Sequence, residues 1–233
     1  MVKKKKKSTI LVRGGINRTF HDETSEALFL TSGYVYNSAE EAESAFKEEK
    51  KRFMYSRFGN PTVEAFQEKL SKIEGAETCW ATTTGMSALF TIFMSYLKKG
   101  DRVVSSKALF GSCHYIVTEI LPNFGIDVEL VDGTDLNQWE KALKKKTKIV
   151  FFETPSNPCL DLVDISNVSK LAHKSGALVV VDNVFASPIL QKPLKLGADI
   201  VMYSATKHMD GQGRVLGGAI LSTYNFCQKY IKP

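Results

Sequence analysis

Ala177-Leu178-Val179-Val180-Val181-Asp182 is a run of five apolar residues that ends on a carboxylate. Its β-branched valines favour a strand, and the absence of alternating polar residues indicates a strand that is buried on both faces. Such strands are typical of parallel sheets that helices cover on both sides. No apolar run in the sequence approaches the roughly 20 residues of a membrane-spanning helix, so we expect no membrane partner.

The rest of the chain repeats this pattern, with short apolar strands separated by helices. Strands are predicted over 78–82, 102–106, 127–131, 148–153, 177–181, 199–203 and 215–221, and helices over 85–98, 112–123, 136–146 and 164–174. A further helix is predicted from Pro61, which Asn60 can cap, to Gly75. The alternation indicates an α/β fold with a mostly parallel sheet, helices on both faces and right-handed crossovers.

The first 60 residues differ from this pattern. Gly-rich and turn-like patches interrupt them, and only one short helix near 38–50 is predicted, so they are interpreted as an extended N-terminal arm. Residues 61–233 form the candidate ligand-binding domain. The net charge of the chain is +6, and Lys3–Lys7 supply most of it. No aromatic residue interleaves with this run, as base stacking would need, so we interpret it as a solvated tail and predict no nucleic-acid partner.

Composition excludes several classes of protein. Hydrophobic residues make up 43% and charged residues 24%, as in an ordinary globular protein. The four cysteines include no C-x-x-C pair and the four histidines lack ligand spacing, so neither a disulfide framework nor a metal site is predicted. No apolar segment follows the basic start, so we expect no secretory signal, and a cytoplasmic protein is the default expectation.

Polar side chains at the strand ends carry the chemistry, because ligands of such sheets bind at the carboxyl ends of the strands. Asp182 ends a buried strand, where a carboxylate needs a cation or a donor. Lys207 follows the next strand, preceded by the hydroxyls of Ser204 and Thr206. Gly85 opens a helix whose free N–H groups can bind an anion. Each signal alone is more often a cap or a surface residue. Together they supply a phosphate cradle, an imine-forming amine and a carboxylate, which fit pyridoxal 5′-phosphate.

An aromatic face for a flat ring is predicted at Phe110, which follows the strand that ends at Ser106. Phe110 has no hydroxyl and cannot do acid–base work, so Lys207 is left as the proton shuttle. Cys113 lies near the same place at a helix start, which would favour a thiolate, although a small buried residue is the more common role.

Five short segments occur in the order in which one known family has them. They are 55–62 (Tyr-Ser-Arg-Phe-Gly-Asn-Pro-Thr), 84–86 (Thr-Gly-Met), 153–158 (Glu-Thr-Pro-Ser-Asn-Pro), 181–183 (Val-Asp-Asn) and 204–207 (Ser-Ala-Thr-Lys). With them the sequence resembles the Cys/Met-metabolism family of pyridoxal-phosphate enzymes, from about Gly14 to the end of the chain. The resemblance implies the large domain of the aspartate-aminotransferase-like (type I) fold.

The resemblance also implies residue roles. Lys207 would be the Schiff-base lysine, Asp182 the partner of the ring nitrogen, and Asn157 a neighbour of the phenolic oxygen. Tyr55 and Arg57 would reach the phosphate of a neighbouring subunit, which makes the site a property of a homo-oligomer; a guanidinium suits this role because it binds phosphate in a bidentate way. The phosphate would otherwise be held by Gly85, Met86, Ser204 and Thr206.

The segment Phe110-Gly111-Ser112, where most members have Tyr in place of Phe110, resembles one branch together with residues 26–34. This is the O-succinylhomoserine sulfhydrylase branch, transferases of methionine biosynthesis and transsulfuration that replace the γ-succinyl ester with sulfide to give homocysteine. A cystathionine γ-synthase or γ-lyase and an inactive cofactor-binding remnant stay open as alternatives. The family has a further C-terminal domain, which a chain ending at Pro233 lacks, so we expect a fragment of a dimeric or tetrameric enzyme.

Overall fold

A computed structural model describes residues 6–232 of the chain, so Lys3–Lys5 of the lysine run lie outside the described residues. The chain divides into two compact units, with the division after Lys72. The predicted boundary between arm and domain at 60/61 stays a prediction.

Unit 1, up to Lys72, contains α1 (Lys7–Arg13), α2 (Ala39–Phe46) and most of α3 (Pro61–Glu74). The predicted helices at α2 and α3 are confirmed, and the Asn60 side chain caps α3 by accepting from the N–H of Thr62 at 2.8 Å. The interpretation of the first residues as irregular is wrong at α1. Its N-terminus has no side-chain cap and several of its residues are β-branched, so the sequence gives no helix signal there.

Unit 2 is built on a sheet of seven strands. In spatial order these are β1 (Thr78–Thr82), β7 (Gly218–Ser222), β6 (Ile200–Ser204), β5 (Leu178–Asp182), β4 (Ile149–Glu153), β2 (Arg102–Ser106) and β3 (Asp127–Val131). The five strands from β6 to β3 run parallel, and β7 is antiparallel to both of its neighbours. The mostly parallel sheet predicted from the sequence is confirmed. The last strand begins at Gly218 rather than at 215, because residues 211–217 form an exposed turn.

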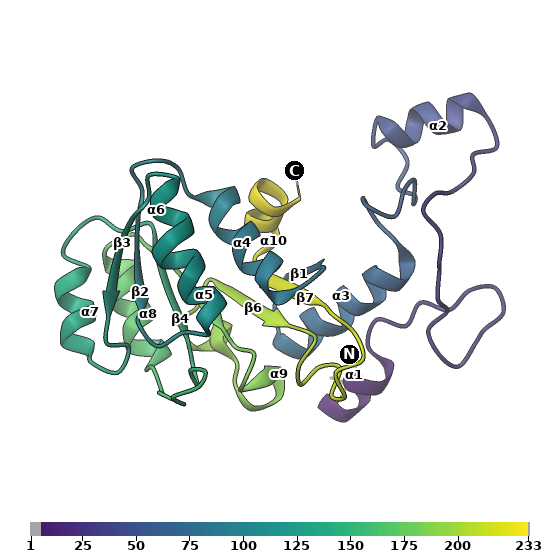
Figure 1. Cartoon of the computed structure of the whole chain (residues 1–233). Coiled ribbons are helices and arrows are strands. Elements are labelled where there is room, and N and C mark those ends of the chain that lie inside the picture. The colour runs from purple at the N-terminus through teal and green to yellow at the C-terminus, as the bar shows by residue number, and fades with distance from the viewer. Residues whose placement is uncertain (1–5, 233) are drawn as a thin grey trace. The chain divides into compact units, whose positions relative to one another are not determined.

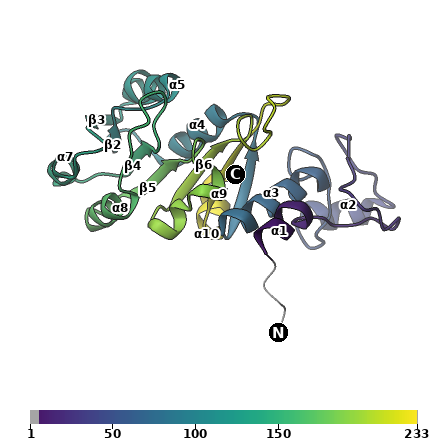
Figure 2. The same cartoon turned by 90° about the horizontal axis from the view of Figure 1, so that it is seen from below.

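Helices cover both faces of this sheet (Figures 1 and 2). One face carries α4 (Gly85–Tyr96) and a continuous helical stretch of α5 (Gly111–Tyr115), the π-helix η1 (Ile116–Ile120) and α6 (Leu121–Asn123), with α10 (Tyr224–Phe226) and the π-helix η3 (Cys227–Ile231) near α4. The other carries α7 (Leu136–Ala142), α8 (Ile165–Lys174) and the 3-10 helix η2 (Pro193–Leu196). The short helix α9 (Ser187–Leu190) follows β5. Between residues 6 and 232 no helix combines the length and the hydropathy that crossing a membrane requires.

The core of unit 2 lies on both sides of the central strands. Every residue of β4 is buried, as are those of β5 from Val179 onward. On one side Phe93 of α4 meets Phe151 edge to face at 5.4 Å, and on the other Trp139 of α7 meets Phe152 at 5.9 Å. Each such ring contributes about 1.5–3 kcal/mol by burial. The sheet is therefore a rigid support for the loops at its carboxyl edge.

A buried polar chain lies within unit 2. The amide of Asn183 donates to the Tyr203 hydroxyl at 2.6 Å, and that hydroxyl donates to Glu74 Oε2 at 2.6 Å. Lys192 Nζ lies 4.0 Å from the same carboxylate oxygen. Burial raises the pKa of Glu74 to about 7, although the Tyr203 hydrogen bond and the positive charge of Lys192 lower it. Asn183 follows Asp182 directly, so these hydrogen bonds help to fix the backbone at the end of β5.

We expect Glu74 to make unfolding depend on pH. Its pKa in the folded protein is raised from 4.5 to about 7, so the folded state holds a proton that the unfolded state has lost, and stability falls as pH rises through that window. Glu74→Gln cannot ionise and should lack this fall, which is on the order of 2–3 kcal/mol. Denaturant unfolding at pH 5 and pH 8 measures it. Equal pH dependence in both proteins would contradict the assignment.

Candidate active site

The carboxyl edge of the sheet brings most of the predicted site residues together. Glu153 at the end of β4 is in register with Asp182 at the end of β5, and Asp182 is in register with Met202 of β6. Ser204 ends β6, and the turn that carries Lys207 follows it. Because these strands run parallel, their ends lie at one edge, which is the expected place for a ligand of this fold.

Asp182 is buried, with 4% of its surface exposed. Its Oδ1 accepts from the N–H of Val184 at 3.0 Å, whereas within residues 6–232 its Oδ2 accepts from the thiol of Cys113, a weak donor, at 4.0 Å. Burial, and then the nearby Glu153 carboxylate, raise the pKa of Asp182 to about 8. One oxygen of this carboxyl group therefore lacks a strong donor, and a protonated ring nitrogen would supply one.

Cys113 is also buried, and burial, followed by Asp182, raises the pKa of its thiol. It is therefore a protonated, small buried residue. The interpretation of Cys113 as a small buried residue is confirmed, and the thiolate alternative is not, because the loss of water outweighs the effect of the short helix α5.

The start of α4 forms an anion-binding geometry beside β6. Thr84 caps the helix in a capping box with Ser87, so the N–H of Ser87 is satisfied. The N–H groups of Gly85 and Met86, in the first turn, have no acceptor inside the helix. A Cβ added to Gly85 would lie 2.7 Å from Ser204 Cβ, so only glycine permits this close approach. These two N–H groups and the Ser204 hydroxyl can serve a phosphate together.

The turn after β6 holds Lys207 at the surface. Thr206 Oγ1 accepts from the N–H of Gly217 at 3.0 Å, and the N–H of Lys207 donates to Ser204 O at 3.3 Å. Lys207 is exposed, and its side chain has no hydrogen bond or ion pair within residues 6–232. Its amine is available for a covalent bond to an aldehyde.

Two further loops meet at Glu153, which the sequence analysis did not select as a site residue. The N–H of Phe110 donates to Glu153 Oε2 at 2.7 Å, and the backbone of Asn157 also hydrogen-bonds this carboxylate. The Phe110 ring is 42% exposed. The signal for Glu153 was present in the sequence, because an acidic residue that ends a wholly apolar strand needs partners just as Asp182 does.

Tyr55 and Arg57 belong to unit 1, within which the structure brings them together. The Arg57 guanidinium carbon lies 4.7 Å from the Phe58 ring centroid and 5.6 Å from that of Tyr55, which is 45% exposed. Their contact with a phosphate of a neighbouring subunit stays a prediction.

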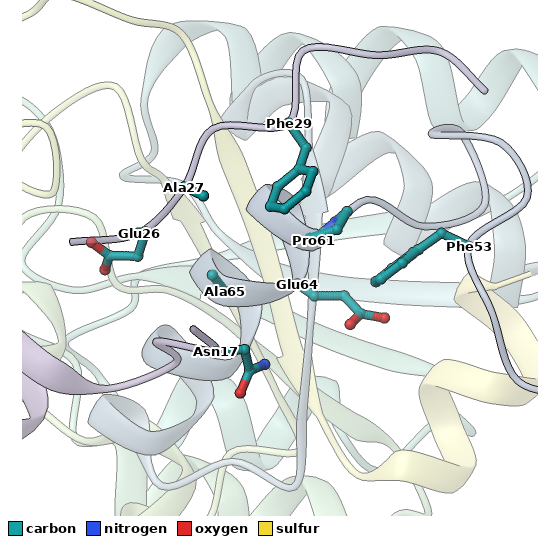
Figure 3. A pocket seen from close by; sticks show the side chains of 8 residues that line it. All are labelled: Asn17, Glu26, Ala27, Phe29, Phe53, Pro61, Glu64 and Ala65. Atoms are coloured by element: carbon teal, nitrogen blue, oxygen red, sulfur yellow. The ribbon is translucent and has the colours of Figure 1, made fainter. Parts of the chain in front are cut away.

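Unit 1 also has a hollow of about 100 Å³. Figure 3 shows Phe29 and Phe53 at its rim with Pro61 between them, and Glu64 on the helix below. It contains none of the predicted cofactor residues, and Glu26 in its wall forms an ion pair with Lys69. The predicted cofactor residues of unit 2 lie instead at the carboxyl edge of its sheet.

The residues at that edge fit pyridoxal phosphate. A carboxyl oxygen with only a thiol donor, a glycine-opened helix start and an uncommitted lysine amine match the ring nitrogen, the phosphate and the aldehyde. The sequence profile of the Cys/Met metabolism PLP-dependent enzymes matches residues 8–232. The chain belongs to this family. Pyridoxal phosphate is the cofactor of this family, as the residues at the edge had indicated.

Relatives within the family include several with assigned activities. The chain is 56% identical over 214 residues to an O-succinylhomoserine sulfhydrylase of Mycobacterium tuberculosis, covering 92% of this chain and 53% of the relative. It is 39% identical to an L-methionine gamma-lyase of Fusobacterium nucleatum subsp. polymorphum, with coverage of 92% and 54%. The chain thus spans about half the length of the curated relatives it matches.

Solved structures of this family share the fold. A putative O-acetylhomoserine (thiol)-lyase from Campylobacter jejuni, which holds a pyridoxyl-lysine monophosphate, superposes with a TM-score of 0.89 at 29% identity over 97% of this chain and 56% of the other. A cystathionine gamma-lyase from Lactobacillus plantarum, complexed with L-serine, gives 0.88 at 31% identity over 98% and 57%. The predicted α/β fold of the type I enzymes is confirmed.

Proposed function

We propose that the protein is a transferase that replaces the γ-acyl group of an O-acylhomoserine, with O-succinylhomoserine as the preferred substrate, by sulfide to form homocysteine. The observation that carries the proposal is the juxtaposition of buried Asp182 with the Gly85 helix start and the Lys207 turn at one sheet edge. The identity to sulfhydrylases of this family supports the choice of reaction.

The residues would act in defined ways. When bound, the cofactor's ring would accept the electron pair left on the substrate when a proton departs from the α-carbon. Asp182 would hold the proton of the ring nitrogen, and Asn157 would bind the phenolic oxygen. The amine of Lys207 would carry the cofactor between turnovers and move protons at the α- and β-carbons during them. Phe110 would cover the ring without taking part in proton transfer.

Elimination without replacement is the second candidate. The identity to L-methionine gamma-lyases, 39% and 37%, favours it, since the match covers these relatives as fully as it covers the sulfhydrylases. A cystathionine γ-synthase would use cysteine in place of sulfide as the nucleophile. A cystathionine γ-lyase is the other alternative, and a solved structure of that enzyme is similar to this chain. An inactive cofactor-binding remnant is the remaining alternative.

Product analysis separates these candidates. The purified full-length protein with pyridoxal phosphate is given O-succinylhomoserine with sulfide, with cysteine or with neither, and methionine alone in a parallel reaction. We expect homocysteine, formed in the reaction with sulfide, to be the dominant product. Dominant cystathionine, or a 2-oxo acid from methionine, would assign the chain to another branch, and no product at all would favour the remnant.

Assembly and location are part of the same proposal. It remains a prediction that the protein forms a homo-oligomer in which Tyr55 and Arg57 complete the site of a neighbouring subunit. A cytoplasmic location also remains a prediction.

A further inference from the structure

Glu153 is buried, with 3% of its surface exposed, and has no cationic partner among residues 6–232. A carboxyl group in such a place costs free energy unless hydrogen bonds offset it. It also stands in register with the carboxyl of Asp182 on the adjacent strand, and the two like groups raise the cost of ionising either. Replacing a buried ionic group with an apolar side chain of similar volume is often neutral or stabilising, so packing alone does not explain a carboxyl group at this position.

The hydrogen bonds of Glu153 indicate its role. The carboxylate accepts from the backbone N–H of Phe110, in the loop between β2 and α5, and of Asn157, in the loop after β4. These loops belong to different parts of the chain, since Phe110 and Glu153 are 43 positions apart in the sequence. β4 lies between β2 and β5 in the sheet, so Glu153 stands between the Phe110 loop and Asp182.

We propose that Glu153 is a positioning residue that clamps the Phe110 loop and the Asn157 loop to the sheet edge, so that an aromatic face and an amide are held in place around a flat, phosphate-bearing ring. This inference rests on the cofactor site of the proposed function. The clamp acts through backbone N–H groups, so it fixes loop position whatever side chains the loops carry. Bonds of N–H groups to a carboxylate are stronger than bonds to a neutral acceptor, which suits a clamp.

The clamp is tested first without cofactor. Hydrogen exchange of the amides of Phe110 and Asn157 is measured in the full-length protein and in Glu153→Ala, and both amides should exchange about 10-fold faster or more in the variant. Asp199→Asn is the matched control. Asp199 also accepts a backbone N–H, that of Val179 at 2.7 Å, but at the opposite end of β5. It should leave the two amides unchanged, whereas unchanged amides in Glu153→Ala would overturn the proposal.

The second measurement is affinity for pyridoxal phosphate, followed by absorbance. Glu153→Ala should weaken it about 10-fold or more, and Glu153→Gln, which keeps one acceptor oxygen, should recover part of the loss. A purely structural role would lower stability without this graded recovery, and equal affinity in all three proteins would overturn the proposal. Should Glu153→Ala fail to fold, the exchange and affinity of Glu153→Gln decide alone. If wild type does not bind the cofactor, the proposed function fails, while the exchange result still decides the clamp.

Discussion

Lys207→Ala should abolish covalent attachment of pyridoxal phosphate and lower turnover at least about 10³-fold, since the residue is assigned both the covalent bond and the proton transfers. The structure supports a large effect, because the amine is exposed and free of competing ion pairs within the described chain. The turn that carries it is fixed by backbone bonds, so removing the side chain leaves the backbone in place. The visible absorbance band of the lysine-bound cofactor measures the first effect.

Lys170→Ala provides the control for this variant. Lys170 is an exposed lysine of α8, which covers a face of the same sheet. Its loss should leave band and turnover unchanged. A band that persists in Lys207→Ala would remove Lys207 from its assigned role.

Asp182→Asn should retain covalent attachment but lower turnover about 100-fold or more, which is the scale of losing one preorganised electrostatic partner. The amide cannot hold a positive charge on the ring nitrogen, although it keeps nearly the same shape and can still accept from the N–H of Val184. Steady-state rates with saturating cofactor measure the effect. Wild-type turnover in this variant would contradict the assignment.

The same substitution should change the cofactor-free protein. The pKa of Asp182 is raised from 3.8 to about 8, so the folded state keeps a proton over this window that the unfolded state has lost. Stability contributed by this group is therefore highest at low pH and falls as pH rises towards 8. Denaturant unfolding of Asp182→Asn should therefore be less sensitive to pH over this range than that of the wild type.

The fold was largely predictable because the strands are short, apolar and β-branched. The strands at 78–82, 102–106 and 127–131 have the bounds that the structure gives them. The proximity of the candidate site residues could also be predicted, because Asp182 ends a strand, Lys207 and Gly85 each follow one, and parallel strands share one edge. Here topology converts positions along the chain into proximity.

What could not be predicted depends on contacts between distant residues. The hydrogen-bond chain Glu74–Tyr203–Asn183 joins residues up to 129 positions apart in the sequence, and no local sequence pattern predicts such a pairing. The clamp at Glu153 requires knowing that the Phe110 loop folds back over β4. The helix α1 was missed for the opposite reason, since it lacks the local cap that a sequence can show.

The most direct measurement is to reduce the cofactor-loaded full-length protein with borohydride and to locate the added mass by peptide mass spectrometry. We expect the pyridoxyl mass on the peptide that contains Lys207. The same peptide should carry no added mass when the cofactor is withheld from the unsubstituted protein. The mass on any other lysine would contradict the placement of the site at the carboxyl edge of β5 and β6.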